Sequence, residues 1–200
     1  AFGMSSAQEQ RKGRILICTQ VFQESLDADA DIMVSDICPI DDLIQRVGRL
    51  RRHTRNSKGQ VEADAVDVRD PPVIYLHSPD WQEQPDAQWL QRNFPRTQAV
   101  YGSPGRLWLG MKALRLAGGI RLPSGTRQLI EAVYSKEAKN QIPKGLQRLE
   151  EEYIQKQRIK TSKGINSALR WEYGYYNSSE SGFTKDDDSS TRFIEIETME

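Results

Sequence analysis

Hydrophobic positions in the first eighty residues fall into short continuous runs. Residues 15–18 (ILIC), 31–38 (DIMVSDIC) and 73–76 (VIYL) are runs of strand length that are apolar on both faces, which is typical of parallel strands covered by helices on two sides. Residues 41–52 follow Pro39 and carry Asp41 and Asp42 in their first turn, where carboxylates complement a helix dipole. This order of elements predicts an α/β fold with a partial parallel sheet.

After residue 80 the apolar positions recur at helical spacing instead. The pattern predicts helices over residues 104–116, 124–134 and 143–163, besides a short one over residues 7–12 that ends at Gly13. Residues 177–190 are poor in apolar side chains and indicate a flexible linker. We therefore expect four parts: the sheet-containing domain (1–80), a mainly helical accessory region (81–176), a linker (177–191) and the start of a C-terminal domain (192–200).

The overall charge gives no argument for a nucleic-acid or membrane partner, but its distribution does point to a ligand. The chain of 200 residues has 28 Lys and Arg against 28 Asp and Glu. Residues 44–58 nevertheless carry six basic side chains and no acidic one. Such a block indicates a place for an anionic ligand, and the alternative interpretation is a solvated helix face.

Cysteine usage and hydropathy suggest the compartment. Cys18 and Cys38 lie in apolar runs and form no spaced cluster with His53 or His77, which argues against a disulfide framework or a structural zinc site. No apolar run approaches the roughly 18 residues of a membrane span. We expect a cytoplasmic protein without a membrane segment and without a metal site of its own.

Two polar clusters carry the chemistry that the sequence suggests. Residues 19–27 (TQVFQESLD) follow the first predicted strand, and residues 45–52 (QRVGRLRR) end the helix predicted over 41–52. Ligands of open α/β sheets bind beyond the carboxyl ends of strands. Arg49 and Arg52 are three residues apart, so on a helical turn they would converge and clamp a transferring phosphoryl group. Gly48 would permit close approach of the backbone.

The order and spacing of these clusters resemble motifs V and VI of superfamily 2 helicases. More narrowly, they resemble the CRISPR-associated helicase–nuclease of type I systems, whose pattern is close to ATQVVEQSLD followed by CP…QRxGRxxRH. Here Gln23 and Glu24 stand in the reverse order. The segments FGMSSAQEQRKGRIL, YGSPGRLWLGMKAL and IRLPSGTRQLIEAVY are also similar to that family, so the resemblance covers nearly the whole chain.

The resemblance implies roles for individual residues. Thr19 corresponds to the motif V threonine that contacts a phosphate of the tracked strand, with Gln20 beside it. Asp27 corresponds to the aspartate near the nucleotide ribose, and Gln45 to the glutamine that senses the nucleotide next to Gly48. Arg49 and Arg52 correspond to the arginine fingers on the γ-phosphate.

The resemblance also implies a function for the parent protein. It would be an ATP-dependent single-stranded-DNA translocase and helicase in antiviral defence, with nuclease activity in another domain and a guide-RNA surveillance complex as partner. ATP and Mg²⁺ would be held mainly by the first helicase lobe. The chain has no G-x-x-x-x-G-K-[ST] loop, no DEAH-like acidic motif and no His-Asp cluster. We therefore expect this chain alone neither to hydrolyse ATP nor to cut DNA.

Two alternatives stay open, and several residues have an ordinary structural interpretation. The chain could come from a generic superfamily 2 RNA helicase, or be a non-catalytic remnant of a disrupted gene. His53 matches the family's Arg-His pair, although a lone histidine is more often a surface residue. Trp108 is expected in a core, and the aromatic residues at 171–176 would either pack or stack on bases.

Overall fold

The computed structural model describes residues 2–25, 27–64 and 66–167. The fold divides into two compact units, Ala1–Glu150 and Glu151–Glu200. The predicted linker, the predicted start of a C-terminal domain and the aromatic cluster at 171–176 lie outside the described residues. The predicted boundary after residue 80 stays a prediction.

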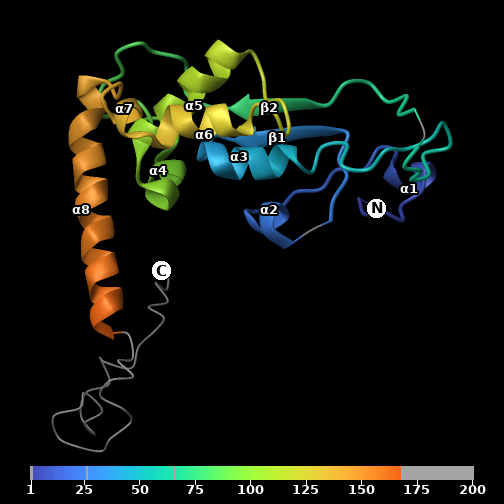
Figure 1. The fold of residues 1–200 in the computed structure, drawn as a ribbon, viewed down its shortest axis with the longest axis horizontal. Helices are drawn as coiled ribbons and strands as arrows, with labels where there is room; N and C mark the ends of the chain where they lie inside the picture. Colours follow the sequence, from blue (N-terminus) through green and yellow to red (C-terminus); the bar gives the residue numbers. More distant parts are fainter. Residues whose placement is uncertain (1, 26, 65, 168–200) are drawn as a thin grey trace, which may run out of the picture. The chain divides into compact units, whose positions relative to one another are not determined.

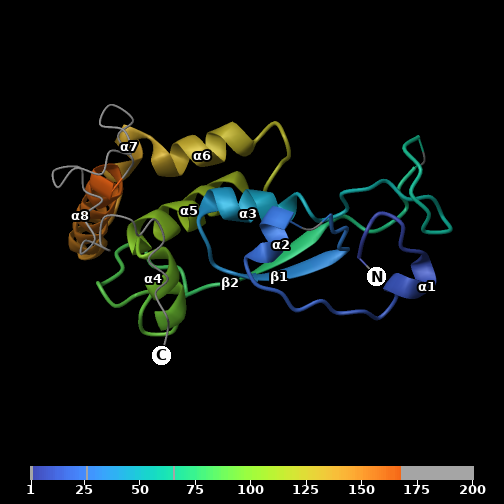
Figure 2. The same cartoon turned by 90° about the horizontal axis from the view of Figure 1, so that it is seen from below.

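Two of the three predicted strands pair in a parallel sheet. Strand β1 (Ile32–Asp36) lies beside β2 (Val73–His77), with Ile32 opposite Val73 and Asp36 opposite His77. Helix α3 (Ile40–Val47) connects them and lies beside the strands in both views (Figures 1 and 2). Only one face of β1 is covered, because Met33 and Ser35 are buried while Ile32 and Val34 are 63% and 73% exposed. The expectation of a strand covered on two sides is wrong for this unit.

The prediction of a buried strand over residues 15–18 is also wrong. The segment is extended but makes no ladder bonds in the part of the chain that the structure describes, and Ile15 and Ile17 are 88% and 92% exposed. Together with the exposed face of β1 it lines a hollow of about 1640 Å³. A strand exists only where a neighbour accepts and donates its backbone hydrogen bonds. The apolar run therefore identifies sequence suited to a strand, while pairing decides whether the strand forms.

The helices predicted over residues 7–12, 104–116, 124–134 and 143–163 are confirmed. The short helix α1 (Gln8–Arg11) precedes Gly13, which has a φ of 68°. Helix α5 (Pro104–Ala117) ends at a left-handed Gly118, as expected of a glycine C-cap. The other helices are α2 (Val21–Ser25), α4 (Pro95–Tyr101), α6 (Thr126–Tyr134), α7 (Lys136–Lys139) and α8 (Lys144–Ser167). No helix in the described ranges combines the length and the hydropathy of a membrane span.

One hydrophobic core fixes α3 against the helices that follow the sheet. Ile40 and Leu43 of α3 share it with Trp108 and Leu107 of α5 and with Leu129 of α6. Trp108 is 3% exposed, and its indole Nε1 donates to the Gln82 carbonyl oxygen at 2.8 Å, which satisfies its polar atom. The expectation that Trp108 belongs to a core is confirmed. This packing holds the amino-terminal end of α3, and with it the segment that leads into the basic block.

Replacing Gly145 by alanine is expected to destabilise the fold. A Cβ atom at this position in the first turn of α8 would overlap the carbonyl oxygen of Pro85 and lie 3.1 Å from the Cα atom of Asp86. Both neighbours are backbone atoms and cannot turn aside, so we expect a loss of about 1–3 kcal/mol in the free energy of unfolding, measured by urea denaturation. Gly110→Ala is the control, because the nearest atom to its Cβ would be 3.9 Å away, an ordinary contact. An equal loss for both variants would contradict this explanation.

Candidate functional site

The basic block does not continue α3, so the prediction that Arg49 and Arg52 share a helical turn is wrong. The helix ends at Val47, and Gly48 follows it as the C-cap. Leu50 pairs with Ala30 in a parallel bridge, in which the Ala30 amide donates to the Arg49 carbonyl oxygen and the Arg51 amide donates to the Ala30 carbonyl oxygen, both at 2.9 Å. Glycine is a poor helix former, so the helix is weakened at position 48. The two hydrogen bonds to Ala30 then hold the residues after α3 outside the helix. We call residues 48–52 the arginine turn.

The conformation of Arg51 shows how sharply the arginine turn bends. Its φ of 47° lies in the left-handed region, where a Cβ atom is costly, and in the described chain it is the only non-glycine residue with a positive φ. The two hydrogen bonds to Ala30 hold it there. Strained backbone of this kind persists only where its surroundings fix it.

The structure holds Arg49 and Arg52 through different partners. Arg49 donates from Nη2 to the carbonyl oxygen of Gln23 at 2.8 Å, and its buried Nε has no hydrogen-bond partner among the described residues. Arg52 reaches Asp27 with Nε at 3.1 Å, and both side chains are about half exposed. His53 contacts the same carboxylate oxygen at 3.2 Å. The predicted nucleotide residues Asp27 and Arg52 are therefore together, while Arg49 contacts the segment of α2.

Gln23 links α2 to α3 and was not selected from the sequence. It is 5% exposed; its Nε2 donates to Asp42 Oδ1 at 2.9 Å and its Oε1 accepts from Arg46 Nε at 2.9 Å. An amide both donates and accepts, so it matches a carboxylate and a guanidinium at once, whereas a glutamate would face Asp42 with a like charge. The sequence did carry a signal for Gln23, because Gln23 and Glu24 stand in the reverse order from the family pattern.

Tyr101 of α4 joins the two polar clusters, and no sequence pattern indicated it. Its hydroxyl accepts from Gln20 Nε2 at 3.2 Å and from Arg46 Nη2 at 3.0 Å. Arg46 in turn donates from Nη1 to Ser35 Oγ at 2.8 Å. Gln20 of the first cluster and Arg46 of the second are thus bridged by a residue more than fifty positions away along the chain.

The remaining predicted residues make few contacts. Thr19 and Gln45 are exposed, and neither side chain makes a hydrogen bond within the described segments. Gly48 has an ordinary right-handed backbone (φ −62°, ψ −3°), and a Cβ there would lie 3.3 Å from the Gln45 carbonyl oxygen. The three positions lie beside the engaged arginines without taking part in their contacts.

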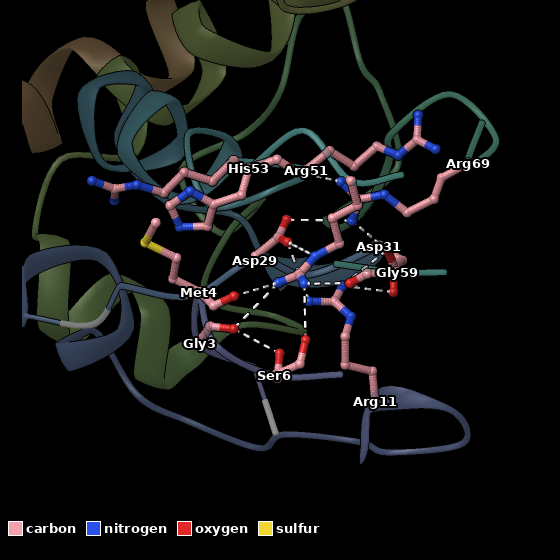
Figure 3. A network of polar contacts seen from close by, with 12 residues as sticks. Gly3, Met4, Ser6, Arg11, Asp29, Asp31, Arg51, His53, Gly59 and Arg69 are labelled. Atoms are coloured by element: carbon pink, nitrogen blue, oxygen red, sulfur yellow. Dashed lines mark hydrogen bonds and ion pairs between the residues drawn. The ribbon is translucent and has the colours of Figure 1, made fainter. Parts of the chain in front are cut away.

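A buried ionic network lies under the arginine turn (Figure 3). Asp29 is fully buried and accepts from Arg55 Nε at 2.6 Å, from Arg11 Nη1 at 3.2 Å and from Arg69 Nη1 at 3.4 Å. Arg55 is 1% exposed, and its remaining N–H groups donate to backbone carbonyl oxygens, among them those of Ser6 at 2.9 Å and Gly59 at 2.8 Å. Because Asp29 precedes Ala30, which binds the arginine turn, the network fixes that turn from below.

A second carboxylate gives this network a pH dependence. Asp67 accepts from Arg69 Nη2 at 2.7 Å, and this guanidinium holds the pKa of the Asp67 carboxyl well below its usual range. A lowered pKa in the folded state means that the interaction stabilises the fold above the ordinary aspartate pKa of about 4. That contribution is lost as the pH falls further and Asp67 becomes protonated.

No group of three or more His, Cys, Asp and Glu side chains is placed to hold a metal ion in residues 2–25, 27–64 and 66–167. Apart from the Asp27 carboxylate and the His53 imidazole, this site offers guanidinium, amide and hydroxyl groups. These groups bind anions, and phosphate in particular.

The chain is similar in sequence to known proteins. Residues 2–55 match the family model described as CRISPR-associated nuclease/helicase Cas3, C-terminal. The chain is 30% identical over 124 residues to the CRISPR-associated endonuclease/helicase Cas3 of Escherichia coli strain K12, an alignment that covers 61% of this chain and 12% of that protein. The chain therefore spans about an eighth of that relative's length.

Two solved structures are similar to most of the chain. The crystal structure of T. fusca Cas3 with ATP has a TM-score of 0.58 and 26% identity, covering 82% of this chain and 17% of that one. A chain in the structure of a CRISPR RNA-guided surveillance complex in the pre-nicking state has a TM-score of 0.55 and 25% identity, covering 83% and 19%.

The class of fold follows from these likenesses: a partial RecA-like parallel sheet followed by a mainly helical region. The family match, the curated relative and the structural neighbours agree on one family. The chain is similar to part of a Cas3 protein, and over residues 2–55 that part is the one the family model describes as C-terminal.

Proposed function

We propose that this chain is part of an ATP-dependent single-stranded-DNA helicase of CRISPR antiviral defence, and that it supplies the arginine fingers and part of the strand contact. The arginine turn carries the proposal, because it presents Arg49 and Arg52 on backbone that the Ala30 bridge and the Asp29 network hold in place. The ATP in the T. fusca Cas3 structure and the family match support it. The nuclease activity belongs to a part of the parent protein that lies outside this chain.

The geometry suggests how the arginines serve hydrolysis. Each guanidinium presents a planar set of donors that matches phosphate oxygens, and it neutralises charge that develops on the transferring phosphoryl group. Arg49 retains a buried Nε without a partner, so a phosphate oxygen would satisfy a donor that is otherwise unpaired. Gln45 in the last turn of α3 and Gly48, the first residue of the arginine turn, would meet the same nucleotide.

Arg52 has to exchange partners to take part. In this structure its charge is balanced by Asp27, and the pair is half exposed, so solvent screens it and the exchange costs little. Asp27, once released, is free to accept from the ribose of the nucleotide, with His53 still beside it. ATP itself, with Mg²⁺, would be held mainly by the first helicase lobe. The side chains at this site in the described residues do not fit Mg²⁺, because no three carboxylate, imidazole or thiol groups converge there.

The strand and the partner complex belong to the same proposal. Thr19 and Gln20 would contact the phosphates of a single DNA strand, and the surveillance complex that appears with a structural neighbour would deliver that strand. The match to Cas3 structures extends over 82% of this chain, including its helical region, and favours this proposal over a generic RNA helicase, which would share only the two motifs.

Stimulation of ATP hydrolysis by nucleic acid tests the proposal. In the full-length protein that contains this chain, single-stranded DNA is expected to raise the ATP turnover rate several-fold, and RNA of the same sequence is expected to raise it less. The measurement is steady-state phosphate release with each polymer at saturating concentration. Stronger stimulation by RNA would favour the generic helicase, and indifference to both polymers would favour a non-catalytic remnant.

A further inference from the structure

One face of α4 turns toward the hollow that Thr19 and Gln20 line. Arg96, Thr97, Val100 and Tyr101 all border this hollow. Their spacing of i, i+1, i+4 and i+5 places them on one side of a helix. This face joins the predicted strand contact from a different part of the chain, and none of the expected functional residues lies on it.

The Tyr101 hydroxyl has a donor to spare. A phenol oxygen accepts hydrogen bonds and also carries one proton. Gln20 Nε2 and Arg46 Nη2 both donate to this oxygen, and in the described structure its own proton has no acceptor. The two donors hold the phenol oxygen at the border of the hollow, and its own O–H is left available to donate.

Arg96 adds an uncompensated charge to the same face. It is exposed, it makes no ion pair with any described residue, and no other residue of α4 is charged. A positive charge that lacks a nearby acid attracts anions without first breaking a salt bridge. The face therefore combines a neutral hydroxyl donor with a free guanidinium, on the same hollow that Thr19 lines.

We propose that Tyr101 and Arg96 form a second contact to the sugar–phosphate backbone of the bound single strand, next to the contact at Thr19 and Gln20. Phosphodiester oxygens accept from both groups, and neither group reads a base, so the contact positions the strand without selecting sequence. The inference rests on the proposed function, since it requires that the parent protein binds a single strand. It adds the helical region after the sheet to the strand-binding surface.

The experiment measures affinity for a fluorescent oligodeoxythymidine in the full-length protein across a range of salt concentrations. Tyr101→Phe removes one hydroxyl and no charge, so we expect the Kd to rise about tenfold with the salt dependence unchanged. Arg96→Gln removes one charge, and we expect a weaker complex whose salt slope falls by about 0.7. Arg96 is exposed and makes no ion pair with the described residues, so this variant keeps the test valid if Tyr101→Phe disturbs the fold.

Tyr134→Phe is the matched control. Its hydroxyl donates to Asp41 at the other end of α3, at 2.6 Å, and Tyr134 does not border the hollow. The same single-atom change there is expected to leave the Kd for the strand unaltered. A rise for Tyr134→Phe equal to that for Tyr101→Phe would mean that loosening α3 weakens strand binding, and would overturn the proposal.

Two further comparisons complete the experiment. One distinguishes a contact to the strand from a contact to ATP, and the other distinguishes a failure of this inference from a failure of the proposed function. If Tyr101→Phe weakens a fluorescent ATP analogue as much as the strand, or more, the hydroxyl does not serve the strand and the proposal is overturned. If both variants bind the strand like the parent protein, while DNA still stimulates ATP turnover, this inference fails and the proposed function stands. A parent protein that binds no single strand would overturn both.

Discussion

Replacing Arg49 by alanine in the full-length protein is expected to reduce ATP turnover by about 10³–10⁵-fold, the loss typical of removing an arginine finger. The fold should survive, because among the described residues the guanidinium makes one hydrogen bond, to the Gln23 carbonyl oxygen. The measurement is kcat at saturating ATP and single-stranded DNA, with a thermal melt to confirm folding. An unchanged kcat would remove the basis of the proposed function.

Arg127→Ala is the matched control for this variant. Arg127 lies on α6, is 88% exposed in its side chain, and pairs with Glu131 one turn away. The variant loses the same guanidinium group at a surface outside the proposed nucleotide site. Its ATP turnover is therefore expected to stay at the level of the parent protein. Arg52→Ala is expected to reduce ATP turnover as Arg49→Ala does. Its stability is expected to stay unaltered, because the lost ion pair with Asp27 is exposed.

Replacing Asp29 by alanine is expected to destabilise the fold by about 3–5 kcal/mol, as breaking a buried ion pair does. Arg55 is about as buried as Asp29, so it would lose the only carboxylate partner that it has among the described residues, at a position shielded from solvent. Arg11 and Arg69 would each lose one of their acidic partners and keep Asp31. The free energy of unfolding from urea denaturation checks this result.

Arg92→Ala provides the comparison for a salt bridge at the surface. Asp86 pairs with Arg92 at 2.8 Å, and both side chains are more than half exposed. Because solvent screens such a pair, we expect no measurable change in stability. If Asp29→Ala were equally silent, the network would not hold the arginine turn, and the rigid presentation of Arg49 would need another cause.

Much of the secondary structure could be predicted from local pattern. The helices α1, α5, α6 and α8 were indicated by apolar spacing and by capping residues such as Gly13 and Gly118, which act within a few residues of the helix they end. Strands β1 and β2 were indicated by apolar runs. The boundary of α3 was not, because Gly48 weakens a helix without deciding where it stops, and the bridge to Ala30 made that decision.

Some residues of the candidate site could likewise be predicted from the sequence, and others could not. Motif order and spacing in the sequence selected Thr19, Gln20, Asp27, Gln45, Gly48, Arg49 and Arg52, and the structure brings Asp27 and Arg52 into contact. Pattern could not find Tyr101 or the Asp29–Arg55 pair, since each joins residues more than twenty positions apart. The sequence pattern also predicted that Arg49 and Arg52 share one helical turn. The left-handed backbone of Arg51 prevents this.

By itself the sequence determined which residues carry charge and hydrogen-bonding groups, where helices and strands are favoured, and which family the chain resembles. Only the tertiary structure decided where those groups point and which of them meet. The physical reason is one of range: propensity and capping act within about one turn of chain, whereas burial and hydrogen bonding depend on segments that only folding brings together.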